Sequence, residues 1–97
     1  MTSTVRNNTE QKRFELLVDE EVIGIAAYED TGEMLVFTHT EIQPGHEGKG
    51  YAGTLIRFAL DEVRERELLA LPVCPFVQGW IEKHPDYHDL DYRSKAR

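Results

Sequence analysis

The stretch from Met34 to Val73, MLVFTHTEIQPGHEGKGYAGTLIRFALDEVRERELLALPV, decides the fold of this chain. Its first nine residues are rich in β-branched and aromatic side chains and predict a strand over Met34 to Ile42. Leu68 to Val73 is a continuous apolar run, which is typical of a buried strand. Between them apolar residues recur at helical spacing: Tyr51, Ala52, Leu55, Ile56, Ala59, Leu60 and Val63. Strand, helix and strand in this order predict a βαβ unit whose second strand runs parallel to the first.

Within the first of these strands the side chains alternate between the two faces of the expected sheet. The alternation predicts Leu35, Phe37, His39 and Glu41 on one face. A histidine beside Leu35 and Phe37 is more often a hydrogen-bonded core or rim residue than a base, so both interpretations of His39 stay open on this pattern alone.

Upstream of this unit, two short apolar runs predict two further strands, Phe14 to Val18 and Val22 to Tyr28. The acidic residues Asp19 to Glu21 between them predict a tight turn. Gly24 inside the second run indicates a bulge or a close backbone approach. Together with Met34 to Ile42, these runs predict a three-stranded antiparallel meander.

Downstream, Cys74-Pro75 predicts the start of another helix, because proline suits the first helical position. This helix ends before His84-Pro85, and Trp80 on it is expected to pack in the core. The whole chain is therefore expected to form one α+β domain over residues 13–92. Residues 1–12 are expected to be a flexible leader and residues 93–97 a loose tail.

Composition narrows the class of protein. Eleven Lys and Arg against eighteen Asp and Glu give a net charge of −7, which disfavours nucleic acid as a main partner. The single cysteine, Cys74, rules out an internal disulfide, and the four histidines lack the spacing of metal ligands. No run is long enough to span a membrane, and the polar N-terminus does not resemble a secretory signal. We therefore expect a cytoplasmic protein without a metal.

The loop before the long helix is the first candidate for chemistry. It reads Gly45-His46-Glu47-Gly48-Lys49-Gly50-Tyr51-Ala52-Gly53. Small residues let backbone amides approach an anion closely, and the helix N-terminus adds a partial positive charge. The pattern therefore suits a pyrophosphate, although a glycine-rich turn without a ligand remains the alternative.

The second candidate is Cys74, which lies between a buried strand and a helix start. The helix dipole favours its thiolate form and would make it reactive. A lone buried cysteine is, however, more commonly a core residue, so the position alone leaves both roles open.

Taken together, the meander, glycine-rich loop, amphipathic helix, buried strand and helix resemble the acetyl-CoA-binding half of the GNAT acyltransferase superfamily. Glu47 to Ala52 falls on that superfamily's Gln/Arg-x-x-Gly-x-Gly/Ala pyrophosphate loop, with Glu47 in place of Gln or Arg. The segments His39-Thr40-Glu41-Ile42, Cys74-Pro75-Phe76-Val77 and His84-Pro85-Asp86-Tyr87 resemble its small single-domain YjdJ-type branch.

This resemblance implies a minimal GNAT fold that binds acetyl-CoA. The pantetheine arm would enter between Met34–Ile42 and Leu68–Cys74, with Cys74 and His39 as the catalytic candidates. Larger members carry two helices between their first and second strands to shape the acceptor site, and the step from Val18 to Val22 leaves no room for them. The implied contacts to acetyl-CoA are Thr40, Glu41, Ile42, Glu47, Gly48, Lys49, Gly50, Tyr51, Ala52, Gly53, Cys74 and Phe76.

The leading hypothesis is an N-acetyltransferase that moves acetyl from acetyl-CoA to an amine acceptor, acting as a monomer or weak dimer. The alternative is a CoA or acyl-CoA binding module with a regulatory role and no efficient turnover. A small interaction domain without a ligand is a third possibility, which requires the glycine-rich loop to be only a turn.

Overall fold

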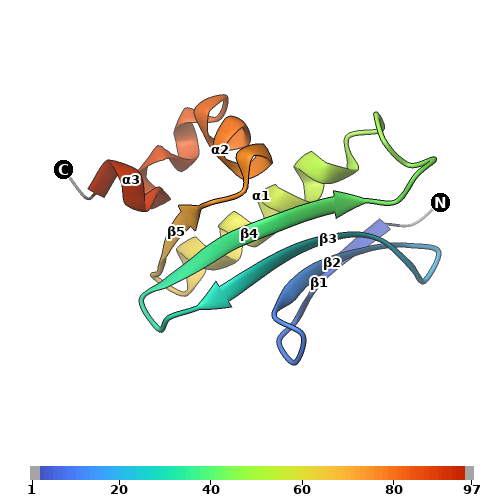
Figure 1. Cartoon of the computed structure of the whole chain (residues 1–97), viewed down its shortest axis with the longest axis horizontal. Coiled ribbons are helices and arrows are strands. Elements are labelled where there is room, and N and C mark those ends of the chain that lie inside the picture. Colours follow the sequence, from blue (N-terminus) through green and yellow to red (C-terminus); the bar gives the residue numbers. More distant parts are fainter. Residues whose placement is uncertain (1–2, 96–97) are drawn as a thin grey trace.

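The computed structural model describes residues 3–95, with side chains described through Arg93. Its five strands form one sheet in the order β1-β2-β3-β4-β5 (Figure 1). They are β1 Ser3–Asn8, β2 Arg13–Val18, β3 Glu21–Asp30, β4 Met34–Ile42 and β5 Leu69–Pro72. The first four pair antiparallel and β5 runs parallel to β4. The expected α+β fold with its βαβ unit is therefore confirmed.

The first two helices are those predicted from the sequence, and two more follow that were not predicted. In chain order the helices are α1 Tyr51–Glu65, α2 Pro75–Glu82, the 3-10 helix η1 Pro85–Leu90 and α3 Tyr92–Lys95. The face of α1 that packs on the sheet is the apolar stripe seen in the sequence, from Leu55 to Val63. In Figure 1, α1 lies behind the strands, and no helix within residues 3–95 covers the nearer face of β2, β3 and β4. We call this uncovered side of the sheet the bare face. No helix within residues 3–95 combines the length and the hydrophobicity needed to cross a membrane.

The N-terminal segment departs from the expectation. Residues 3–8 are not a flexible leader but the edge strand β1, paired along its length with β2 from Ser3↔Val18 to Asn8↔Arg13. The meander accordingly has four strands rather than three. The expected boundary at residue 13 is therefore wrong for residues 3–8, and residues 1–2 lie outside the described residues.

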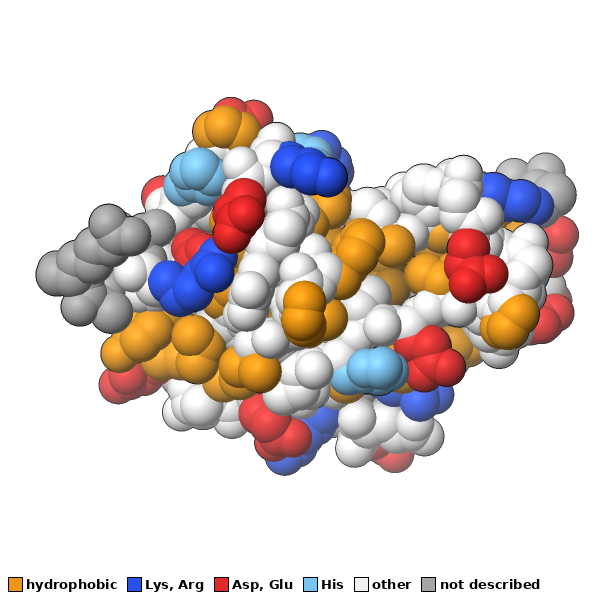
Figure 2. All heavy atoms as spheres, turned by 45° about the horizontal axis from the view of Figure 1, so that its top comes forward, with side chains coloured by type: hydrophobic (Ala, Val, Ile, Leu, Met, Phe, Trp, Pro, Cys, Tyr) orange, Lys and Arg blue, Asp and Glu red, His pale blue; other side chains and the backbone are white. Residues whose placement is uncertain are grey.

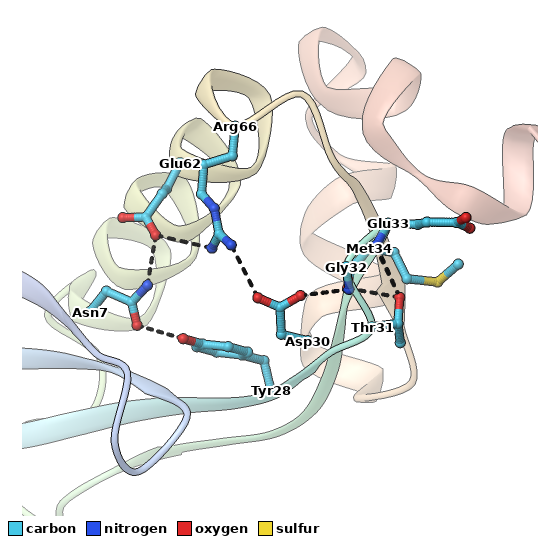
Figure 3. Close-up of polar contacts among 9 residues, drawn as sticks. All are labelled: Asn7, Tyr28, Asp30, Thr31, Gly32, Glu33, Met34, Glu62 and Arg66. Carbon is cyan, nitrogen blue, oxygen red and sulfur yellow. Dashed lines mark hydrogen bonds and ion pairs between the residues drawn. The ribbon is translucent and has the colours of Figure 1, made fainter.

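Polar contacts explain why this strand is ordered. The side-chain amide of Asn7 donates to Glu62 of α1 at 2.6 Å, and Tyr28 of β3 donates to the Asn7 oxygen at 2.7 Å (Figure 3). Arg66 extends the same chain of contacts to Asp30 at the end of β3. A strand with one apolar side chain, Val5, is thus held by backbone pairing and by a polar network that spans three elements.

The C-terminal end also differs from the expected loose tail. Tyr92–Lys95 forms the short helix α3, and Arg93 pairs with the buried carboxylate of Asp91 at 2.7 Å. The backbone of Asp91 also forms an isolated parallel β-bridge with Ala70 of β5. The tail expectation is therefore wrong for Arg93 to Lys95, and residues 96–97 lie outside the described residues.

Candidate functional site

The site begins where β4 and β5 separate. The two strands pair from Met34↔Leu69 to Phe37↔Pro72. The backbone N–H groups of Val73 and Cys74 then both donate to the carbonyl oxygen of Phe37, at 3.0 and 2.9 Å, and the chain turns into α2. Within the described residues, the edge of β4 from Thr38 to Ile42 consequently has no strand beside it on this side.

A bulge in β4 determines which side chains face this opening. The register passes from Ala27↔His39 to Tyr28↔Phe37, which leaves Thr38 as an extra residue. An extra residue re-aims the side chains that follow it. Thr40 therefore shares the α1 face with Leu35 and Phe37, whereas His39 lies on the opposite face.

The alternation expected from the sequence is thus wrong beyond Phe37. His39 and Glu41 do not share a face with the buried Leu35 and Phe37. They lie on the bare face of the sheet, where His39 Nε2 is 3.2 Å from Glu41 Oε2 and both side chains are more than half exposed.

The loop between β4 and α1 forms the wall of a pocket of about 420 Å³, which we call the loop pocket. Gly45, Gly48 and Gly50 all have φ between 78° and 92°, a backbone conformation that side chains disfavour. In Figure 2, hydrophobic side chains gather in the hollow between the two lobes of this face. The pocket is lined by Thr40, Ile42, His46, Glu47, Gly48, Gly50, Tyr51, Ala52, Gly53 and Phe76.

The N-terminus of α1 opens onto this pocket. Gly50 is the N-cap residue, and the first turn contains no acidic side chain. The first backbone N–H groups of a helix have no partner within it and carry the positive end of its dipole. The loop pocket is therefore suited to a bound anion, although the whole chain is acidic.

Nine of the ten residues that line the loop pocket are among the contacts implied by the sequence. The tenth, His46, is new, and its buried Nδ1 atom has no hydrogen-bond partner among the described residues. Its ring lies 6.1 Å from that of Tyr51. No pattern in the sequence separates His46 from its glycine-rich surroundings, because its burial depends on how the loop folds back.

Three predicted contacts lie outside the lining of this pocket. Glu41 points to the bare face and lines a separate hollow with Arg13 and Gln43. Lys49 is exposed on the loop. Cys74 is buried, and its thiol is 3.5 Å from the hydroxyl of Thr40, which does line the pocket.

The surroundings of Cys74 favour its thiolate form. Burial alone would raise the pKa of the thiol, but the hydrogen bond with Thr40 and the backbone N–H groups of Val77 and Phe76 outweigh it. The pKa of Cys74 is therefore lowered from its ordinary value. His39 does not contribute, because it lies across the sheet from the sulfur.

Comparison with known families agrees with this geometry. A sequence model of the family described as GCN5-related N-acetyl-transferase matches residues 13–90. The chain belongs to the GCN5-related N-acetyltransferase family. It is also 34% identical over 63 residues to Protein NATD1 of human and of chicken. That alignment covers 64% of this chain and 56–57% of those relatives, so the chain spans little more than half of their length.

Solved structures with the same fold include other GCN5-related proteins. A GCN5-like protein from Staphylococcus aureus has a TM-score of 0.70 at 18% identity, over 91% of this chain and 86% of that one. The N-acetylglutamate synthase of Neisseria gonorrhoeae, solved with coenzyme A and N-acetyl-glutamate, has a TM-score of 0.59 at 17% identity. That match covers 89% of this chain and 23% of the synthase. At these identities the likeness establishes the fold.

Proposed function

We propose that this protein transfers an acetyl group from acetyl-CoA to an amine acceptor. The observation that carries the proposal is the loop pocket, where the N-terminus of α1 meets the opening between β4 and β5. Membership of the GCN5-related family supports it, as does the coenzyme A bound by the structurally similar synthase.

Each part of the site has a role in this proposal. Backbone amides from Gly48 to Gly53 bind the pyrophosphate, as helix N-termini do for many anions. The free edge of β4 from Thr38 to Ile42 pairs with the pantetheine arm. A backbone N–H of that edge polarises the acetyl carbonyl and stabilises the oxyanion that forms on attack.

The transfer follows one of two routes. In the direct route, the deprotonated amine attacks the thioester carbon, the carbon–sulfur bond breaks, and the departing CoA thiolate takes up a proton. In the route through Cys74, its thiolate attacks first and forms an acetyl-cysteine while CoA leaves. The amine then attacks that second thioester and regenerates the thiol. The lowered pKa of Cys74 supports the second route, and its burial favours the first.

The acceptor side is open. Only the four-residue turn of residues 9–12 joins β1 to β2, so this chain has no helices between its first and second strands, where larger relatives carry two. We propose that the acceptor approaches over the bare face of the sheet and is a protein or peptide as readily as a small amine. His39, paired with Glu41 on that face, is the group placed to accept the ammonium proton.

The same openness supports a second candidate function, a CoA or acyl-CoA binding module without efficient turnover. In either case we place the chain in the small YjdJ-type branch of the family, as a monomer or weak dimer without a metal. We also propose a cytoplasmic location, because a reducing compartment keeps the Cys74 thiol available.

Mass spectrometry separates these functions. The protein is incubated with acetyl-CoA and a mixture of peptides with free amines, and both protein and peptides are then analysed. Acetylated peptides with released CoA support the transferase, and acetyl on Cys74 that hydroxylamine removes supports the route through the cysteine. Tight binding of acetyl-CoA without any acetylated product would favour the second candidate function, a binding module without efficient turnover.

A further inference from the structure

A second groove adjoins the loop pocket, and we call it the Arg57 groove. It has a volume of about 480 Å³ and shares Gly50 and Gly53 with the loop pocket. Gly53, Arg57 and Asp61 follow one another at intervals of four residues, so they lie on one face of α1. Opposite them are Trp80 of α2 and His84, which follows that helix. The groove thus leads away from the helix N-terminus along α1.

The guanidinium of Arg57 has no salt bridge among the described side chains. The other five arginines described there, Arg6, Arg13, Arg64, Arg66 and Arg93, each pair with an aspartate or glutamate. Arg57 instead lies over the rings of Trp80 and Tyr87, at 5.3 and 5.6 Å. One of its nitrogen atoms donates to the Tyr87 hydroxyl at 3.3 Å. Aromatic contacts therefore hold this cation in place without neutralising it.

The carboxylate nearest to Arg57 on α1, that of Asp61, already accepts a hydrogen bond from another side chain. Asp61 lies one turn beyond Arg57 on the same face and accepts a short hydrogen bond, 2.6 Å, from the Tyr87 hydroxyl. Tyr87 thus separates the two charges, since it accepts from Arg57 and donates to Asp61. The positive charge of Arg57 remains available at the end of the groove nearer to Gly53.

Trp80 adds a second free donor at the same place. Its indole Nε1 has no hydrogen-bond partner among the described residues, and it lies 3.4 Å from the position that a Cβ on Gly53 would take. The indole is held in position by His84, whose ring stacks on it at 3.7 Å. His84 Nδ1 donates to the Trp80 carbonyl oxygen at 2.6 Å, because that oxygen can only accept. The groove therefore presents a guanidinium and an N–H group to a ligand that accepts hydrogen bonds.

We infer that the Arg57 groove binds the 3′-phosphoadenosine end of CoA and that Arg57 recognises its 3′-phosphate. This inference rests on the proposed function, since the pyrophosphate must lie at Gly50 to Gly53 for the adenosine to enter the groove. A planar guanidinium matches a phosphate monoester through two parallel hydrogen bonds. The protein should consequently prefer CoA to 3′-dephospho-CoA, which is identical except for this phosphate.

The test is isothermal titration calorimetry of the whole chain with CoA and with 3′-dephospho-CoA at one fixed salt concentration. We expect the wild type to bind CoA about tenfold more tightly or better, as for a well-formed charge-assisted contact. Arg57→Gln should weaken CoA binding by a similar factor, leave dephospho-CoA binding nearly unchanged, and so abolish the preference. Arg57→Lys retains the charge without the planar fork and should keep part of it.

Arg64→Gln is the matched control. Arg64 lies two turns further along α1 and also stacks over Tyr87, at 5.7 Å, but it pairs with Asp89 and does not line the groove. This variant should retain the full preference. Equal wild-type affinity for the two ligands, or an undiminished preference in Arg57→Gln, would overturn the inference while leaving CoA binding intact. A wild type that binds neither ligand would instead overturn the proposed function.

Discussion

The sulfur of Cys74 lies 3.5 Å from the side-chain oxygen of Thr40, across the point where β5 turns away from β4. The contact joins the residue before α2 to the strand edge that faces the loop pocket. The contact therefore links the protonation state of the Cys74 thiol to the strand edge where we propose that the thioester binds. The bulge at Thr38 makes this contact possible, because without it Thr40 would face the opposite side of the sheet.

The first prediction concerns the acidity of this thiol. The alkylation rate of Cys74 by iodoacetamide should rise with pH around a midpoint below that of an ordinary cysteine, because its pKa is lowered. Thr40→Val removes the hydrogen bond but keeps the burial, which by itself raises the pKa, so the midpoint should move upward. Peptide mass spectrometry over a pH series measures it. Thr4→Val, at an exposed position on β1, is the control, and an equal midpoint in wild type and Thr40→Val would contradict the prediction.

A second prediction concerns the loop. Gly50→Val should weaken binding of CoA by about tenfold or more, which is about 1.4 kcal/mol. The cause is the backbone, because Gly50 has φ +79° while nothing lies within 4 Å of its missing Cβ. A β-branched residue would distort the N-cap of α1 and crowd its first amides. The neighbouring Lys49→Ala, which removes only an exposed side chain, should cost far less. Calorimetry that finds equal affinities in folded wild type and Gly50→Val would remove the loop from the binding site.

The two faces of β4 give a third prediction. His39→Ala should slow acetyl transfer while leaving the dissociation constant of acetyl-CoA within about twofold, or about 0.4 kcal/mol. The reason is that His39 lies on the bare face with Glu41, across the sheet from the loop pocket. Steady-state kinetics with calorimetry measure both quantities, and His88→Ala on η1 serves as an exposed histidine control. A parallel loss of affinity and rate would place His39 in the CoA site instead.

A fourth prediction concerns the choice of acceptor. With the four-residue turn between β1 and β2 in place of acceptor helices, the bare sheet face offers little to enclose a small amine. Free polyamines and aminoglycosides should therefore be acetylated slowly and with little selectivity between them. An assay of CoA release over a panel of small amines and lysine peptides checks this. Fast turnover of one small amine with a micromolar KM would be inconsistent with an open acceptor side.

The fifth prediction concerns stability in acid. Glu15 points to the side of the sheet that no described helix covers, yet its side chain is buried. It accepts hydrogen bonds there from Arg6 and Arg13 at 2.7 Å and from Asn8. Burial alone would raise its pKa, but these partners outweigh it and the pKa is lowered. The stabilisation is therefore present above the unfolded pKa, about 4.3, and is lost as the pH falls through the folded value.

Glu15→Gln should consequently lower the free energy of unfolding at neutral pH by about 1–3 kcal/mol. It should also flatten the loss of stability as the pH falls below the unfolded pKa of about 4.3, because the variant has no carboxylate to protonate at this position. Urea denaturation over this pH range measures both effects. Glu20→Gln, at an exposed position in the β2–β3 turn, should behave like the wild type. If both variants lose stability in acid as steeply as the wild type, Glu15 is not the responsible group.

The elements that the sequence predicted correctly are those specified by local pattern. The stripe from Tyr51 to Val63 buries one face of α1, and Pro75 starts α2 directly after Cys74. The acidic turn Asp19–Glu20 joins two strands, and both residues have positive φ. Gly24 lies beside a bulge, as its position in the strand predicted, because the register passes from Leu16↔Gly24 to Leu17↔Val22. In each case the periodicity or the turn residues lie within a few positions of one another.

What the sequence by itself determined is therefore the order of strands β2 to β5 and helices α1 and α2, the glycine-rich loop at the start of α1, and the family. Only the tertiary structure decided that the polar segment Ser3–Asn8 is a strand, because its partners Glu15, Tyr28 and Glu62 come from three other elements. The same holds for the bulge at Thr38 that puts Phe37 and His39 on opposite faces, since the register of β4 is set by β3. It also holds for the Arg57 groove, whose donors come from α1 and α2. Contacts between distant residues depend on packing, and no local pattern in the chain encodes them.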